Sequence, residues 1–501
     1  MLSIANRVAK LQRCKTLMRN VSRASYHMNS QKKDTLYSKI SPLGSPSLSL
    51  KPELDEWVEK GKRVRIAELQ RIIHDLRKRK RYTQALEVSE WMNNKGLFTF
   101  SPTQHAVQLD LVGRVNGFLS AESYFNNLME EDKTDKTYGA LLHCYVRQRQ
   151  KDKALSQLQK MKDMGFKLST LTYNDVMCLY AHVGEHEKVH NVLMAMKNDD
   201  VSPDNLSYRL CINSSVAKSD VDGVENILKE MESQPNFVVD WNTYAVVANF
   251  YVKVGLKGKA LDCMKQAEER LDSKDGLGYN HLISLHSRLG NKAEVLRLWG
   301  LEKAACERCI NRDYINLLEA LVRLGELEEA EKLLDEWESS GNCYDYRVPN
   351  TIVVGYCGKG LHEKAKAMLD DLVKRGMSTN PESWSRVAGG HLDKGEIEVS
   401  VECMKVALSL NVEGKGWKPN LRVLAKMLGS LGEKGSIEEV EDFVALLRSV
   451  IPVNREMYHA LITACIRGGK KVEDLLNSMK ADGIEMDKGT KKILSMKQST
   501  S

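Results

Sequence analysis

Residues 170–204 read TLTYNDVMCLYAHVGEHEKVHNVLMAMKNDDVSPD, and this stretch contains the pattern that decides the fold. Apolar residues recur at helical spacing on both sides of Gly184, as the pair Leu193 and Met196 illustrates. A glycine between two such segments can end the first helix in a left-handed conformation and let the chain turn back. The stretch therefore predicts a helix, a tight turn, a second helix and a short loop.

The pattern recurs along the chain with a nearly constant spacing. The dipeptide Thr172-Tyr173 has counterparts 35 residues away in each direction, at Thr137-Tyr138 and Ser207-Tyr208. With position 1 placed three residues before the tyrosine, units start at residues 66, 102, 135, 170, 205, 241, 276, 311, 346, 381, 421 and 455. Adjacent starts lie 33 to 40 residues apart, most often 35. Internal repetition at this period indicates a stack of similar supersecondary units.

When the repeats are aligned, two positions have a direct physical meaning. Position 15 is a glycine in the units that contain Gly184, Gly255, Gly290, Gly325, Gly360, Gly395, Gly435 and Gly469. Position 20 carries small side chains, such as Ala154, Val189 and Ser400, which predicts that the two helices cross closely there. Because neither helix can bury its apolar stripe alone, the units are expected to stack into a solenoid with a continuous core.

The first 33 residues form a basic leader without acidic residues. Residues 1–33 contain eight Lys and Arg, no Asp or Glu, and four serines. Ile4, Val8, Leu11 and Met18 share one face of a helix, and no long uninterrupted apolar segment is present. This composition is typical of an organelle transit peptide. We expect the mitochondrion (matrix), because arginine is at least as frequent as serine; the chloroplast is the alternative, and a basic tail that binds a partner is another.

The net charge of +7 is concentrated in this leader, because 66 basic and 67 acidic residues remain in the rest of the chain. Within that remainder, residues 60–81 contain ten Lys and Arg against two acidic residues. Such a segment suits contacts with nucleic-acid phosphates, which supply affinity without sequence information. The candidate phosphate contacts lie at the first turn between helices: Arg77, Lys78, Arg79, Lys80 and Arg81. A solvated helix end is the alternative interpretation of this run.

We expect five segments along the chain. Residues 1–33 are the transit peptide, 34–52 a disordered Ser/Pro-rich linker, 53–65 an N-terminal capping helix, 66–488 the solenoid, and 489–501 a polar tail. The unit that starts at residue 381 is longer than the others, and its extra residues near 413–416 are expected to form a surface loop.

No catalytic constellation stands out. His186-Glu187-Lys188-Val189-His190 spells the zinc motif H-E-x-x-H, but Val189 occupies the helix-crossing column and a third ligand at a useful spacing is missing. Cys306 and Cys309 are the one close pair among eleven cysteines, which is weak support for a metal or redox site. No run of 18 apolar residues is present to span a membrane. We expect a non-enzymatic protein with no catalytic residues, cofactor, metal, membrane partner or small-molecule substrate.

The repeat resembles the pentatricopeptide repeat (PPR) family. The residues that carry the resemblance are Thr172-Tyr173-Asn174 near the start of the unit, Gly184 at position 15, Met196 at position 27 and Pro203-Asp204 at the end. The resemblance covers residues 66 to about 488, and the uniform length is similar to the P class of plant-type organelle proteins. It implies an all-α fold, a right-handed superhelical solenoid of about twelve helix-turn-helix repeats of 35 residues.

The resemblance also implies a single-stranded organelle RNA as partner, with about one base bound per repeat. In the family, position 5 and the last residue of a repeat contact the base edge, and position 2 stacks on the base. Carried over, the pairs are Asn174 with Asp204 (similar to a uracil reader), Asn350 with Asn380 (a pyrimidine reader) and Ser385 with Asn420 (an adenine reader). Leu171 and Leu206 would enclose the base at Asn174, and Arg347 is a further stacking candidate.

Most other units depart from this pattern, for example Gly139 with Ser169 and Ala245 with Asp275. Two hypotheses therefore stay open. The first is an RNA-binding PPR adaptor that acts in mitochondrial transcript processing, stability, splicing or translation. The alternative is a structural scaffold, a protein-interaction solenoid associated with the mitoribosome or with other organelle RNA-processing proteins, without sequence-specific RNA recognition.

Overall fold

A computed structural model describes residues 35–41, 43, 48–95, 99–272, 274–306, 308–341, 345–410 and 417–495. These residues form α-helices and one short 3-10 helix (Glu130–Asp132), and they contain no β-strand. The predicted transit peptide and the predicted loop near residues 413–416 lie outside the described residues. The chain divides into two compact units, with the boundary between Arg270 and Leu271.

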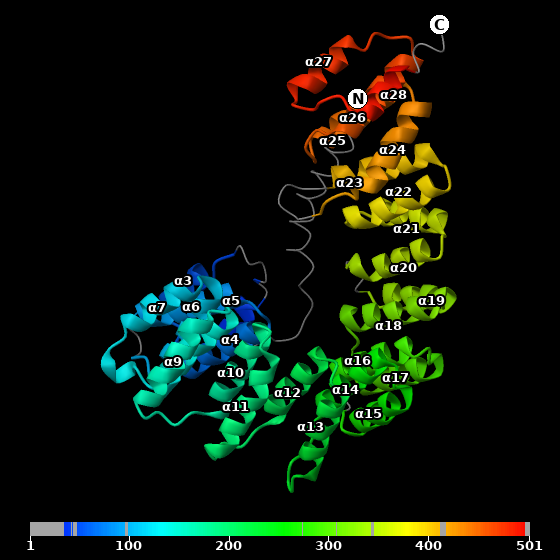
Figure 1. Cartoon of the computed structure of the whole chain (residues 1–501). Coiled ribbons are helices and arrows are strands. Elements are labelled where there is room, and N and C mark those ends of the chain that lie inside the picture. Colours follow the sequence, from blue (N-terminus) through cyan, green and yellow to red (C-terminus); the bar gives the residue numbers. More distant parts are fainter. Residues whose placement is uncertain are drawn as a thin grey trace. The chain divides into compact units, whose positions relative to one another are not determined.

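The first unit begins with two short helices, α2 (Leu36–Ile40) and α3 (Lys51–Glu59), and continues with helix pairs (Figure 1). The pairs are α4 (Ile66–Lys78) with α5 (Tyr82–Asn94), α6 (Pro102–Val115) with α7 (Phe118–Asn126), α8 (Asp135–Arg147) with α9 (Lys151–Asp163), α10 (Thr170–His182) with α11 (His186–Asn198), α12 (Asn205–Ala217) with α13 (Val221–Ser233), and α14 (Trp241–Val254) with α15 (Lys257–Glu269).

The second unit repeats the same arrangement of helix pairs. The pairs are α16 (Gly276–Arg288) with α17 (Lys292–Ala305), α18 (Asn311–Leu324) with α19 (Leu327–Ser339), α20 (Arg347–Gly358) with α21 (His362–Lys374), α22 (Pro381–Asp393) with α23 (Ile397–Ser409), α24 (Leu421–Lys434) with α25 (Ile437–Arg448), and α26 (Arg455–Arg467) with α27 (Glu473–Ala481). Helix α28 (Lys488–Ser495) follows the last pair.

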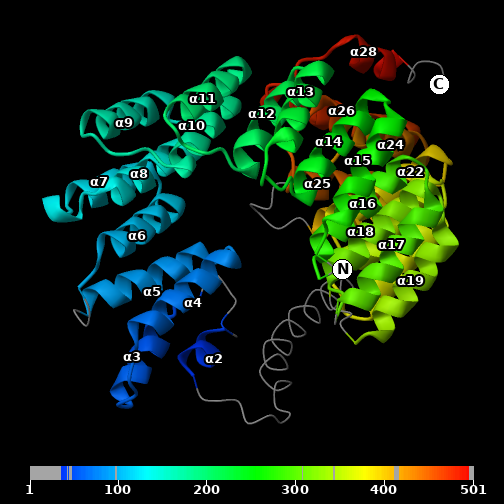
Figure 2. The same cartoon turned by 90° about the horizontal axis from the view of Figure 1, so that it is seen from below.

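The helix pairs have the predicted repeat geometry. Each first helix begins within one residue of the predicted unit start, and the small side chains at position 20, such as Ala154, Val189 and Ser400, are buried. In the first unit, α6, α8, α10 and α12 contact one another in succession, as Figure 2 shows for α6 to α10. In the second unit, α16, α18, α20 and α22 do the same. We call each such row of first helices a first-helix layer; the predicted all-helical class and the solenoid of helix pairs are confirmed.

In ten of the twelve repeats, the turn between the two helices uses a left-handed residue at position 15; in the repeat that starts at residue 102, Asn116 has a φ of −108° and Gly117 is left-handed instead. Gly255, for example, ends α14 with a φ of 83°. Gly435 does not follow this prediction, since its φ is −76° and the turn is made without a left-handed residue. Three repeats place a non-glycine residue at the same position with a positive φ: Lys80 (59°), Arg149 (56°) and Ser219 (58°). The turn geometry is therefore imposed by stacking even where the sequence carries a side chain that disfavours it.

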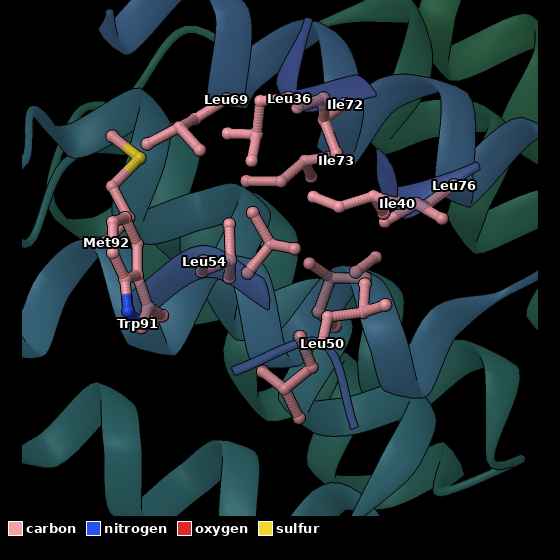
Figure 3. Close-up of a cluster of buried hydrophobic side chains, with 14 of the residues drawn as sticks. Leu36, Ile40, Leu50, Leu54, Leu69, Ile72, Ile73, Leu76, Trp91 and Met92 are labelled. Atoms are coloured by element: carbon pink, nitrogen blue, oxygen red, sulfur yellow. The ribbon is translucent and has the colours of Figure 1, made fainter. Parts of the chain in front are cut away.

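The segment 34–52, expected to be a disordered linker, contains a helix that packs into the core. Thr35 and Ser38 form a reciprocal capping box at the start of α2, with Ser38 N–H donating to Thr35 Oγ1 at 3.2 Å. Leu36 and Ile40, one helical turn apart, are fully buried with residues of α3, α4 and α5 (Figure 3). Burying one such side chain contributes about 1.5–3 kcal/mol. The prediction was wrong because it weighed the serines and prolines and overlooked this apolar pair.

Two further boundaries differ from the expectation. The capping helix, expected at 53–65, is α3 at Lys51–Glu59, because Pro52 occupies its first turn and the chain leaves the helix before the left-handed Gly61. The polar tail expected at 489–501 begins as α28, whose Ile493 and Leu494 pack against the last core cluster. Both differences arise because apolar contacts with the end repeats extend helix formation beyond the repeated pattern.

One core position carries an acid. Glu302 lies at position 27 of its repeat, where other repeats bury methionine, leucine or tryptophan, for example Met196 and Trp337. The Glu302 carboxylate is fully buried, and within the described residues neither of its oxygens has a hydrogen-bond partner. Burial, reinforced by the nearby Asp313 carboxylate, raises the pKa of Glu302 to about 8.

The left-handed turns give a first prediction. Substitution Ser219→Gly should raise the free energy of unfolding by about 1 kcal/mol, because the exposed serine occupies a left-handed conformation that glycine adopts without cost. Gly255→Ala should lower it by a similar amount, although no atom lies within 4 Å of the added methyl position. Denaturant unfolding followed by circular dichroism measures both changes.

The matched control is Gly258→Ala, which adds the same methyl to a helical glycine with open space around it and an ordinary φ. This variant should be neutral or slightly more stable than the wild type. A loss of stability in Gly258→Ala equal to that in Gly255→Ala would show that backbone handedness is not the cause.

The buried acid gives a second prediction. Because the pKa of Glu302 is raised in the folded chain, its contribution to stability is complete below about pH 4.5 and is lost as the pH rises through 8. The wild type should therefore lose stability between these values, on the order of 1 kcal/mol per pH unit. Glu302→Met should remove this dependence and be more stable than the wild type at pH 8.

Denaturant unfolding at about pH 5.5, 7 and 8 provides the measurement. Glu328→Met, on the exposed side of α19, is the control and should leave the pH dependence of the wild type in place. A wild-type stability that is level across this range contradicts the assignment of an unpaired buried carboxyl.

Candidate nucleic-acid interface

The junction between α10 and α12 brings together the residues that the sequence singled out for base recognition. Leu171 and Leu206 occupy the second positions of these two contacting helices, and their residues are 64% and 40% exposed. Large apolar side chains at this exposure are available to cover a flat ligand face. Asn174 and Asp204 lie at the same junction, one turn into α10 and at the N-cap of α12.

Asn174 and Asp204 are bonded to each other and to the next repeat. Asn174 Nδ2 donates to Asp204 Oδ1 at 3.2 Å, and Ser207 Oγ donates to Asn174 Oδ1 at 2.7 Å. Asp204 also caps α12 by accepting from the Ser207 backbone N–H at 2.8 Å. Burial alone would raise the pKa of Asp204, but the hydrogen bonds from Ser207 and Asn174 outweigh the effect of burial and lower the pKa. The Asp204 carboxylate is therefore ionised. Asn174 is only 3% exposed, and its amide therefore serves the junction first.

The second predicted pair shares part of this arrangement. Ser383 Oγ donates to Asn350 Oδ1, and Asn380 caps α22 by accepting from the Ser383 backbone N–H at 2.7 Å. Asn350 and Asn380 are both half-buried. The structure thus joins each of these two residues to Ser383 at the junction of two repeats.

The third pair and the extra stacking candidate are placed differently. Ser385 is buried, whereas Asn420 is exposed and caps α24 by accepting from the Arg422 backbone N–H at 3.0 Å. Arg347 is exposed, but its guanidinium forms an ion pair with Asp345 (Nη2 to Oδ2, 2.6 Å). Hydrogen bonds from Arg347 hold the pKa of Asp345 below its usual range, so this pair carries no net charge.

The five predicted phosphate contacts divide into two groups. Arg77 bonds Asp110, Arg79 donates to the hydroxyl of Tyr37, and Arg81 donates to the backbone carbonyls of Ser41 (3.2 Å) and Leu43 (2.6 Å). These three arginines therefore tie repeats and the N-terminal segment together. Lys78 and Lys80 are exposed beside the turn that follows α4.

Sequence reasoning missed the hydroxyl that completes each junction. Ser207 and Ser383 stand at position 3 of their repeats, and a side chain at position 5 of the preceding repeat bonds each of them. A contact of the same kind joins His459 Nε2 to Thr490 Oγ1 (2.9 Å). In another, a carboxylate replaces the hydroxyl, and Asn280 Nδ2 donates to Asp313 Oδ1 (2.7 Å). The frequent Ser and Thr at position 3 are the sequence signal for this contact.

The zinc-like motif places His186 and His190 on α11. Among the residues that the structure describes, no three His, Cys, Asp or Glu side chains gather where they could hold a metal ion. Within the same residues, no helix is both long enough and apolar enough to cross a lipid bilayer.

Comparison with known proteins identifies the repeat. The family model described as "Pentatricopeptide repeat domain" matches residues 156–217, and that described as "PPR repeat" matches residues 136–166, 314–342 and 348–377. The solved structure of the pentatricopeptide repeat protein PPR10 from maize matches with 17% identity and a TM-score of 0.40, over 91% of this chain and 73% of that one.

Relatives from Arabidopsis thaliana match over nearly the full length. A mitochondrial pentatricopeptide repeat-containing protein is 55% identical over 94% of this chain and 96% of its own length. The large ribosomal subunit protein mL101 is 30% identical over 92% of this chain and 94% of its own length. With these matches and the repeat geometry described above, the chain belongs to the pentatricopeptide repeat family.

Proposed function

We propose that this chain is a non-enzymatic RNA-binding protein of the mitochondrion that acts in the processing, stability, splicing or translation of transcripts. The observation that carries the proposal is the α10–α12 junction, where two exposed leucines flank a hydrogen-bonded Asn–Asp pair. An apolar cover on each side of a polar edge is the arrangement that a single unpaired base requires.

The polar edge has bonding capacity left for a base. Asn174 uses one amide proton and its carbonyl oxygen within the junction, and a primary amide has two protons. The bonds within the junction are made to Asp204 Oδ1, and a carboxylate has a second oxygen that can accept. One donor and one acceptor side by side complement the Watson–Crick edge of uracil, which offers a carbonyl and an N–H.

The proposed location rests on two independent observations. The relative with 55% identity is named as a mitochondrial protein. Residues 1–33 of this chain also have the basic, serine-containing and acid-free composition of an organelle transit peptide. The matrix is the compartment in which a protein with such a leader would meet mitochondrial transcripts.

A scaffold role on the mitochondrial ribosome is the second candidate. It is supported by the relationship to mL101, a protein of a large ribosomal subunit, and by the burial of Asn174 in a junction that is already bonded. In this role the first-helix layers would bind protein or folded ribosomal RNA, and the position 5 side chains would serve only to join repeats.

The RNA-binding proposal gives a third prediction. Asp204→Asn keeps the cap of α12, because asparagine and aspartate cap helices equally well. The variant should therefore have nearly the same free energy of unfolding as the wild type. It should bind RNA with either pyrimidine at this base instead of preferring uracil, as the family pattern implies for the pair Asn350 and Asn380. Leu206→Ala should weaken RNA binding about fivefold, on the order of 1 kcal/mol, through loss of stacking area.

Fluorescence anisotropy with short single-stranded RNAs that differ at one base measures both effects. Leu261→Ala is the matched control, because Leu261 is also 40% exposed but lies on the second helix α15. Equal RNA affinity for the Leu206→Ala and Leu261→Ala proteins, together with an unchanged base preference of Asp204→Asn, would reject the base-reading role.

The two candidate functions differ in a fourth prediction. A transcript-binding adaptor should sediment in light complexes from mitochondrial extracts and become lighter after RNase treatment. A ribosomal scaffold should instead sediment with the large subunit and remain there at low RNase. Gradient sedimentation of the tagged full-length chain, followed by immunoblotting, distinguishes the two.

A further inference from the structure

A pocket lies in the first unit beside the loop that joins α13 to α14, two helices that Figure 1 labels. Its volume is about 420 Å³, which is within the range of ligand pockets. The walls come from the last turn of α13, the loop, the first turn of α14 and the end of α15, and they include Glu232, Phe237, Val238, Tyr244, Gln266 and Arg270. All of these residues belong to the first unit.

The loop differs from the corresponding loops of other repeats. The units that start at residues 205 and 241 are 36 residues apart, one more than the most frequent spacing. The left-handed residue of the loop is Asn236, at position 32 (φ 68°), whereas Gly165 and Gly376 hold this conformation at position 31 of their repeats. The additional residue therefore comes before the left-handed turn. Val238, two residues after the turn, is 75% exposed.

The tyrosine of the next repeat has changed its partner. Tyr208, at position 4, donates to Glu230 at position 26 of its own repeat (2.8 Å). In the repeat that starts at residue 241, position 26 is Gln266, and Tyr244 donates instead to Glu232 at the end of the preceding repeat (2.8 Å). Burial and this bond raise the pKa of Tyr244 to about 12, so the hydroxyl stays protonated and donates.

Arg270 lies beside the ring of Tyr244. Its guanidinium carbon is 4.7 Å from the ring centroid, and its Nη1 donates to Gln266 O (3.0 Å) and Gln266 Oε1 (2.7 Å). These contacts fix the guanidinium, while the residue as a whole remains exposed. A guanidinium stacked on one aromatic ring can receive a second ring on its opposite face.

The loop is held in place before any ligand binds. Asn205, the first residue of α12, donates from Nδ2 to Val238 O (2.9 Å), and its Oδ1 accepts from the Asp240 backbone N–H (3.1 Å). The ring of Phe237 packs edge-on against that of Tyr208, with centroids 5.5 Å apart. A surface that is fixed in advance loses less conformational entropy when it binds a partner.

The charges of the pocket favour a peptide over a nucleic acid. Glu232 and Arg270 are the charged residues of its lining, and their charges cancel. Glu269 Oε2 lies 3.9 Å from Arg270 Nη1 and adds a negative charge at the rim. An RNA strand would therefore meet no excess of positive charge here. A peptide can donate a backbone N–H to the second oxygen of the Glu232 carboxylate, since the Tyr244 hydroxyl bonds the first.

We propose that this pocket binds an aromatic side chain of a partner protein. The ring packs on Val238 and on the exposed face of the Arg270 guanidinium, and the peptide backbone donates to Glu232. Aromatic side chains and arginine are enriched among the residues that contribute most to the affinity of protein interfaces. The inference goes beyond the proposed function, because it does not depend on RNA binding.

The test uses the full-length chain and two neutral peptides, Ac-Gly-Trp-Gly-NH2 and Ac-Gly-Ala-Gly-NH2, with binding measured by saturation-transfer difference NMR. The tryptophan peptide should bind with a dissociation constant on the order of 1 mM, and the alanine peptide about tenfold more weakly or worse. Val238→Ser and Arg270→Gln should each weaken binding of the tryptophan peptide about threefold or more, because each removes one surface that the ring contacts. Val238→Ser retains the backbone carbonyl that holds the loop.

Two matched controls remove similar groups elsewhere. Val254→Ser removes an exposed valine from the other end of α14, and Lys265→Gln removes an exposed positive charge from α15. Each should change the affinity for the tryptophan peptide by less than about twofold. Circular dichroism of every variant verifies folding. A wild type that does not bind the tryptophan peptide at up to about 5 mM overturns the proposal, as does equal weakening in the pocket and control variants.

A second arm separates a protein ligand from a nucleobase. Adenosine and uridine replace the peptides, and the RNA affinity of Val238→Ser is measured by fluorescence anisotropy. The nucleosides should bind about tenfold more weakly than the tryptophan peptide, and Val238→Ser should leave RNA affinity unchanged. Nucleoside binding as tight as that of the peptide, or RNA binding weakened by Val238→Ser, would assign the pocket to RNA and overturn the proposal. Failure of the peptide to bind leaves the proposed function standing, and a chain that binds no RNA leaves the peptide result valid.

Discussion

The fold depends on the close crossing of two helices at position 20 of each repeat. Alanine, valine or serine there lets the backbones approach, and these side chains are buried from the first repeat to the eleventh, for example Ala85, Val224 and Val440. A helix pair of this size exposes too much apolar surface to be stable alone, so each repeat is stabilised by the next. Because the contacts are made between neighbours, the first helices follow one another in chain order, and equivalent positions recur along each first-helix layer.

Under the proposed function, the position 5 side chains would have two competing roles, reading a base and joining two repeats. They lie where one repeat meets the next, and there Asn174, Asn350 and Asn280 bond a side chain at position 3 of the following repeat. Arg209 instead forms an ion pair with Asp240, the last residue of its repeat, at 2.5 Å. After an asparagine amide has bonded position 3 of the next repeat, it retains an N–H donor for a base. In an ion pair between position 5 and the last residue of the repeat, the two side chains bond each other instead. Under the proposed function, an ion pair such as Arg209–Asp240 would leave that repeat without a base-reading pair.

Features that recur could be predicted from the sequence, and features that occur once could not. The unit starts, the small residues at position 20 and the left-handed turn at Gly255 follow from columns that repeat every 35 residues. Helix α2 has no counterpart in the repeats, and the sequence signal for it is a single apolar pair, Leu36 and Ile40.

The same distinction between recurring and single features applies to the candidate site. The pairing of Asn174 with Asp204 was predicted from the family pattern, and the two side chains are bonded. The cluster of Arg77, Arg114 and Arg147 around Asp110 draws its members from three repeats. Position 13, which Arg114 and Arg147 occupy, is a Lys or Arg in seven of the twelve repeats, whereas Asp110 at position 9 and Arg77 at position 12 belong to no such recurring pattern. Only the stacking of α4, α6 and α8 brings them together, so the cluster could not be found without the structure.

In the proposed function, affinity and specificity for RNA would come from different groups. A guanidinium attracts any phosphate, and its effect is independent of the base attached to that phosphate. In the proposed function, the amide and carboxylate at the α10–α12 junction would discriminate among bases. Because they are neutral or negatively charged, they would not attract the strand. Under that proposal, positive charge elsewhere in the chain would have to attract the RNA before Asn174 and Asp204 could select a base. The near cancellation of charge outside the leader is compatible with this proposal, because a local excess of positive charge, such as that of residues 60–81, attracts phosphate whatever the total charge of the chain.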